Sequence, residues 1–78
     1  MEADNAEFYD LRGLSCPMPV LKTRRRLRDM RPGQQLAVLT SDPLAVIDIP
    51  AFCQEDGHVL LKSEGLSMGH RFLIARGD

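Results

Sequence analysis

Apolar residues recur along the 78-residue chain with two different periods, and the period changes several times. Short continuous or alternating apolar runs indicate strands, whereas recurrence at three and four residues indicates an amphipathic helix. These patterns predict strands over residues 8–11, 35–40, 58–64 and 69–76. They predict helices over residues 17–30 and from residue 43 to Gly57. The expected order is therefore strand, helix, strand, helix, strand, strand.

This order predicts a two-layer α/β (α+β) sandwich. Right-handed crossover connections would place both helices on one face of a mixed four-stranded sheet. The last two strands are expected to form an antiparallel hairpin through residues 65–68. Residues 1–7, which are acidic and polar, are expected to be a flexible N-terminus, and residues 8–78 a single domain.

The first helix is expected to begin in the segment Cys16-Pro17-Met18-Pro19. Prolines are tolerated in the first turn of a helix, where the N–H groups have no intrahelical partner. If Pro17 is the first helical residue, Cys16 is the N-cap and its sulfur lies at the positive end of the helix dipole. This placement predicts a lowered thiol pKa, with the Met18 amide as the donor to the sulfur.

The second helix is expected to begin with Asp42 as its N-cap and Pro43 at its first position. Pro50 cannot donate a hydrogen bond to the carbonyl of Val46, so the helix is expected to kink or change register there. Gly57 is expected to end it.

Composition narrows the class of protein. The chain is 44% hydrophobic and 27% charged, with a formal net charge of −1. No apolar run approaches the roughly 20 residues needed to span a bilayer, and the acidic start is unlike a signal peptide. Cys16 and Cys53 do not form a secreted-type disulfide framework. We therefore expect a reduced, cytoplasmic monomer that makes no membrane contact.

One face of the first helix is basic, with cationic side chains at Lys22, Arg24, Arg25, Arg26 and Arg28. Such a face is often only solvated. Alternatively, it is a docking surface for an acidic partner, because charge complementarity speeds encounter. We expect Met18, Lys22, Arg25 and Arg26 to contact that partner. The negative net charge and the small number of aromatic residues argue against direct nucleic-acid binding.

Several segments together resemble TusA/SirA-type sulfur-carrier proteins. Residues 10–19, which read DLRGLSCPMP, resemble the opening motif of that family, including its CPxP sequence. Residues 41–43 (SDP) and 48–53 (DIPAFC) match its second helix, and the RPG turn at 31–33 also fits. The resemblance extends from residue 8 to residue 76.

The resemblance implies a function as well as a fold. Members of this family accept sulfane sulfur as a persulfide on the motif cysteine, from a cysteine desulfurase or a rhodanese. They relay it to a downstream acceptor protein in tRNA thiolation, molybdenum-cofactor assembly or sulfur oxidation. Carried over by position, Cys16 is the persulfide site, Pro17 and Pro19 frame it, and Asp10 and Asp42 are nearby motif acids. The resemblance implies a stoichiometric relay without a cofactor, rather than an enzyme.

Some of these residues have structural alternatives. Asp42 is either the cap of the second helix or a carboxylate close to Cys16, and Asp10 is more simply an anchor for its loop. Cys53 is expected in the core, although it could instead resolve an oxidised Cys16. No metal site is expected, because Cys16 and Cys53 have no zinc-finger spacing to His58 and His70, the two histidines of the chain.

Two rival functions remain open at this point. The first is a protein- or RNA-binding regulatory module that acts through the basic face without sulfur turnover. The second is a redox sensor in which Cys16 and Cys53 form a disulfide. A carrier requires the Cys16 sulfur, whereas the binding module does not.

Overall fold

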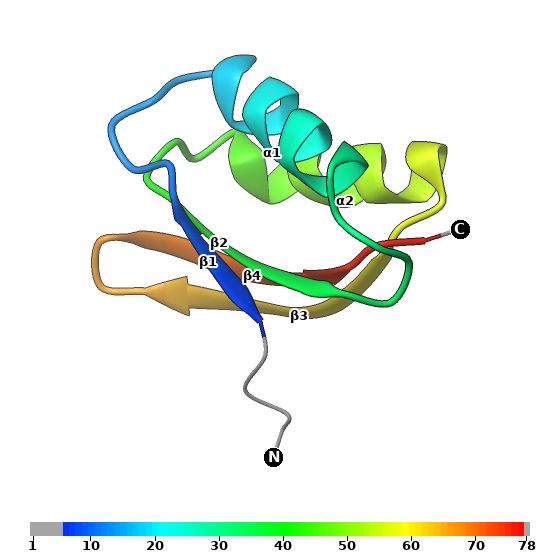
Figure 1. The fold of residues 1–78 in the computed structure, drawn as a ribbon. Helices are drawn as coiled ribbons and strands as arrows, with labels where there is room; N and C mark the ends of the chain where they lie inside the picture. Colours follow the sequence, from blue (N-terminus) through cyan, green and yellow to red (C-terminus); the bar gives the residue numbers. More distant parts are fainter. Residues whose placement is uncertain (1–5, 78) are drawn as a thin grey trace.

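The computed structural model describes residues 6–77. Within this range the chain forms four strands and two helices, arranged as a helical layer on a sheet (Figure 1). In chain order they are β1 (Glu7–Asp10), α1 (Met18–Arg28), β2 (Gln35–Thr40), α2 (Ala45–Asp56), β3 (Val59–Leu66) and β4 (Gly69–Ala75). The predicted order of elements and the α+β sandwich are confirmed.

The sheet has the strand order β1-β2-β4-β3. β1 and β2 are parallel and are joined through α1, whereas β4 is antiparallel to both β2 and β3. Figure 1 shows both helices on the same face of this sheet, as the crossover rule predicts. The two crossovers therefore bring the beginnings of α1 and α2 to one end of the molecule.

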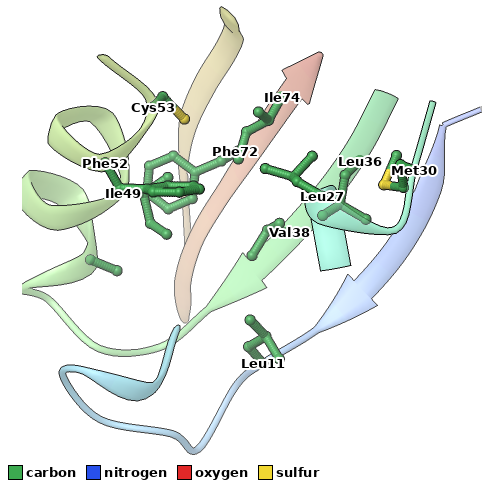
Figure 2. Close-up of a cluster of buried hydrophobic side chains, with 11 residues drawn as sticks. Leu11, Leu27, Met30, Leu36, Val38, Ile49, Phe52, Cys53, Phe72 and Ile74 are labelled. Carbon is green, nitrogen blue, oxygen red and sulfur yellow. The ribbon is translucent and has the colours of Figure 1, made fainter. Parts of the chain in front are cut away.

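The hydrophobic core fills the space between the helices and the sheet (Figure 2). Phe72 and Ile74 of β4 are fully buried there, as are Leu27 of α1 and Ile49 of α2. On α1 the buried residues Pro19, Thr23 and Leu27 recur every four positions, as the helical period of the sequence predicts. This shared core fixes α1 and α2 relative to each other.

Both helices begin later than predicted. The N-cap of α1 is Pro17 rather than Cys16, because the Met18 amide donates to the Ser15 carbonyl (2.9 Å) in a turn that precedes the helix. The N-cap of α2 is Leu44 rather than Asp42. The carboxylate of Asp42 accepts the Leu44 amide (3.1 Å), which forms a side-chain turn leading into α2.

Other boundaries differ less. β3 continues to Leu66, so the hairpin turn is the two-residue segment Ser67-Met68 rather than residues 65–68. The pairing of β3 with β4 shifts between Leu60 and Lys62. α2 continues through Pro50, and the expected bend at this proline stays a prediction.

Gly57 ends α2 in the left-handed conformation (φ 77°), and the amide of this glycine donates to the Cys53 carbonyl. Alanine can adopt this conformation only with steric strain between its Cβ and the following carbonyl oxygen. We expect Gly57→Ala to lower the free energy of unfolding by about 1 kcal/mol. Urea denaturation would measure the change, and an unaltered midpoint would show that the turn relaxes at no cost.

The helices are short. Within residues 6–77, neither α1 nor α2 combines the length and the apolar character that a membrane-crossing helix requires.

Candidate functional site

Cys16 lies in the loop between β1 and α1, and its side chain is exposed. Its thiol donates a hydrogen bond to Oδ2 of Asp48, at a distance of 3.2 Å between Sγ and the oxygen. Asp48 is in the first turn of α2. The thiol is therefore placed where the two parallel helices begin, at an edge that a partner can approach.

The loop that carries Cys16 is held by the loop between β2 and α2. The Cys16 amide donates to Oδ2 of Asp42 (2.6 Å), and the Gly13 amide donates to Oγ of Ser41 (2.7 Å). Of the two roles that the sequence left open for Asp42, the cap of α2 is not formed, because Leu44 is the N-cap, whereas the carboxylate does lie against the cysteine. Its contact is with the backbone of Cys16.

The electrostatic environment of Cys16 is the reverse of the one predicted. The hydrogen bond to Asp48 raises the pKa of the Cys16 thiol, and desolvation by neighbouring atoms and the charges of Asp48 and Asp42 add to the increase. The predicted lowering by the helix dipole assumed an N-cap cysteine with an amide donor. Instead, the Met18 amide bonds to the Ser15 carbonyl, and the sulfur faces a carboxylate.

The two prolines of the motif have different surroundings. Pro19 is buried in the first turn of α1, whereas Pro17 is exposed beside the cysteine. Met18 is 39% exposed. The prolines therefore frame the loop, one from the core side and one from the solvent side.

A groove of about 250 Å³ between the two helices begins at this site. It is lined by Pro17, Val20, Arg24, Asp48, Ala51, Phe52 and Glu55. The groove therefore reaches Pro17, which follows Cys16 in the chain, and Asp48, which accepts the hydrogen bond of its thiol.

Asp10 does not join this cluster. Both of its carboxylate oxygens accept from the guanidinium of Arg12, at 2.9 and 2.8 Å, and the Arg12 amide adds a third bond. These bonds lower the pKa of Asp10 to about 2. The contacts agree with the interpretation of Asp10 as an anchor for its loop.

The basic face of α1 is only partly available to a partner. Lys22 and Arg25 are exposed. Arg26 pairs with Glu7 (3.0 Å) and lies over the Tyr9 ring at 4.7 Å from its centroid, which turns it towards β1. The contact of Lys22, Arg25 and Arg26 with a partner stays a prediction, and Lys22 and Arg25 are better placed for it.

Cys53 is in the core and is only 2% exposed, as predicted. Burial and the nearby charge of Asp56 raise the pKa of Cys53 to about 11, so this thiol is chemically quiet. In the described range, no three His, Cys, Asp or Glu side chains converge as metal ligands would.

Asp48 is the site residue that the sequence analysis missed. It lies within the DIPAFC segment that was matched to the family, but only as part of a helix. A signal was present, because parallel crossovers bring the first turns of both helices to the same sheet edge. An acid four residues into α2 therefore lies near the start of α1.

The fold and the site define a small α/β protein that presents one exposed, hydrogen-bonded thiol where two parallel helices begin. Comparison with known protein families matches residues 7–76 to the family described as sulfurtransferase TusA. Because the match covers nearly the whole chain, the protein belongs to the TusA family, whose role is sulfur carriage between donors and acceptors.

Proposed function

We propose that the protein carries sulfane sulfur as a persulfide on Cys16 and relays it to an acceptor protein. The observation that supports this most directly is the exposed Cys16 thiol, fixed by Asp42 through its backbone and by Asp48 through its sulfur. An exposed sulfur at the end of the molecule suits exchange between proteins. The donor would be a cysteine desulfurase or a rhodanese that carries its own persulfide.

The loading step follows the chemistry of thiol exchange. Cys16 Sγ forms a bond to the terminal sulfur of the donor persulfide, and the S–S bond of the donor breaks. The donor cysteine leaves with the electron pair as a thiolate. The proton of the Cys16 thiol passes to Asp48 Oδ2 and then to the departing thiolate, so the step is neutral in protons and electrons.

The same hydrogen bond would serve the discharge step. The acceptor thiol passes its proton to Asp48 Oδ2 as its sulfur attacks the terminal sulfur of the persulfide, and Cys16 leaves with the electron pair as a thiolate. A thiolate of raised pKa is a poorer leaving group. A proton donor beside the Cys16 sulfur would therefore assist its departure. Protonated Asp48 returns the proton to Cys16, and the carrier is ready for another cycle. Asp42 holds the loop in position throughout.

The test is to find where the sulfur is added. The purified protein would be incubated with a cysteine desulfurase and cysteine, digested, and mapped by mass spectrometry under non-reducing conditions. We expect one added sulfur atom on the peptide that contains Cys16, removed by a reductant, and the same result in Cys53→Ser. Sulfur on Cys53 alone, or none while Cys16 still reacts with alkylating agents, would contradict the proposal.

A further inference from the structure

A polar pocket of about 180 Å³ lies at the opposite end of the helix pair from Cys16. Its lining consists of Arg24, Arg28, Asp56, His58 and Arg76. Asp56 is eight residues further along α2 than Asp48, the hydrogen-bond partner of Cys16, which corresponds to about 12 Å of helix. In Figure 1 the end of β4 runs next to the turn after α2, and the pocket lining includes one residue from each of these segments, Arg76 and His58.

The pocket lining carries more positive than negative charge. It contains three guanidinium groups and one carboxylate, so with neutral His58 the surplus is 3 − 1 = 2 positive charges. Arg24 is occupied by Asp56, to which its Nε donates at 3.2 Å, and its guanidinium lies over the Phe52 ring. Asp56 thus neutralises the charge of Arg24. The other two guanidinium groups of the lining, those of Arg28 and Arg76, could bind an anionic ligand.

Besides the positive charge of the lining, the guanidinium of Arg76 also points to a ligand. Its Nε is buried and has no acceptor within the described part of the chain. Its backbone is fixed, because its amide donates to the Gln34 carbonyl and its carbonyl accepts the Gly33 amide, both at 2.8 Å. A buried charged donor is costly unless an acceptor reaches it. A ligand oxygen in the pocket would satisfy it.

His58 adds a neutral donor. Its Nδ1 accepts the Gly77 amide at 2.9 Å, so the proton of the neutral ring is on Nε2. Burial lowers the pKa of His58 and the charge of Arg76 adds to this lowering, whereas the charge of Asp56 acts in the opposite direction. The chain around Gly77 packs closely against the turn after α2, since a Cβ on Gly77 would collide with the Gly57 carbonyl oxygen. The His58 ring and the backbone around Arg76 are therefore held in place before any ligand binds.

We propose that this pocket binds a small tetrahedral oxyanion of the sulfate and phosphate class. Two negative charges match the surplus of the lining, and four oxygens can accept from Arg28, Arg76 and the His58 ring together. A single carboxylate offers half the charge and fewer acceptors. The site is separate from Cys16 and does not depend on the sulfur chemistry proposed there.

The test uses the Nε–H resonance of Arg76 in a ¹⁵N-correlated NMR spectrum. The full chain would be titrated with sodium sulfate and, separately, phosphate, with chloride added to hold the ionic strength constant. We expect this resonance and the His58 ring signals to shift saturably with both anions. Arg28→Gln should weaken binding about fivefold. Arg25→Gln, on the same helix but outside the pocket lining, should leave it within about twofold.

Several results would overturn the proposal. One is a shift that does not saturate, or that chloride alone reproduces, because it would show only ionic screening. Another is unchanged affinity in Arg28→Gln, or in an Arg76→Gln variant whose spectrum shows a folded protein. A third is an Arg76 Nε–H that is protected from solvent exchange before anion is added and loses this protection in Asp78→Asn. In that case a carboxylate of the chain itself would be the acceptor.

Discussion

Alanine in place of Cys16 is expected to abolish sulfur loading and sulfur transfer while the fold remains intact. The sulfur atom forms the bond to the transferred sulfur, and the other cysteine, Cys53, is buried with a pKa of about 11. No other thiol of the chain can replace it. Because Cys16 is exposed, we expect the free energy of unfolding to change by no more than about 0.5 kcal/mol.

The measurement is the intact mass after incubation with a cysteine desulfurase and cysteine, paired with urea denaturation of the same sample. The matched control is Lys22→Gln combined with Arg25→Gln, which removes two exposed charges of α1 and keeps the sulfur. This control should still load fully from polysulfide, although loading from the protein donor should be about threefold slower. If Cys16→Ala retained biological activity and the control lost it, the rival binding module would be the better account.

Asparagine in place of Asp48 is expected to lower the pKa of the Cys16 thiol. The hydrogen bond to Asp48 is the main cause of the raised pKa, and a neutral amide removes the negative charge that keeps the proton on sulfur. At neutral pH, below the pKa, more thiolate should be present. Alkylation by iodoacetamide should then be faster by about threefold to tenfold. The increase in the alkylation rate is smaller than the increase in the thiolate fraction, because the nucleophilicity of a thiolate falls as its pKa falls.

The full pH dependence of alkylation separates this effect from a loosened loop. In the native protein the rate should rise above neutral pH to a plateau, and in Asp48→Asn the midpoint should move to lower pH. Glu55→Gln, which removes a charge elsewhere in the groove between the helices, should leave the midpoint unchanged. A midpoint that moves to higher pH in Asp48→Asn would contradict the assigned role. We also expect slower persulfide transfer in Asp48→Asn, because the proton acceptor is lost.

The sequence predicted most of the fold, because its elements are encoded locally. The period of the apolar residues located all four strands and both helices. β2 was predicted with the observed bounds, Gln35–Thr40. The helix starts were less predictable, because Asp42 and the Ser15 carbonyl form turns that precede the helices. Such turns compete with helix caps for the same amides.

The site was predictable only in part. Cys16 follows from its position in the CPxP segment, and Asp42 from its proximity to the start of a helix. The pKa of Cys16 was predicted in the wrong direction, because it depends on Asp48, which is 32 residues away in the chain. A local sequence pattern gives the helix dipole, but it does not reveal which side chain of another helix reaches the sulfur.

The two cysteines differ in exposure, so the folded protein offers one thiol per chain for covalent reaction with a partner. Cys16 is exposed and Cys53 is enclosed by the core. A partner whose own cysteine carries an activated disulfide can therefore form one mixed disulfide per native chain, always at Cys16 Sγ, as the small activating thiol leaves. Trapped complexes would contain one partner molecule in one orientation, and a dye or cross-linker added to the folded protein would mark the place where that partner docks.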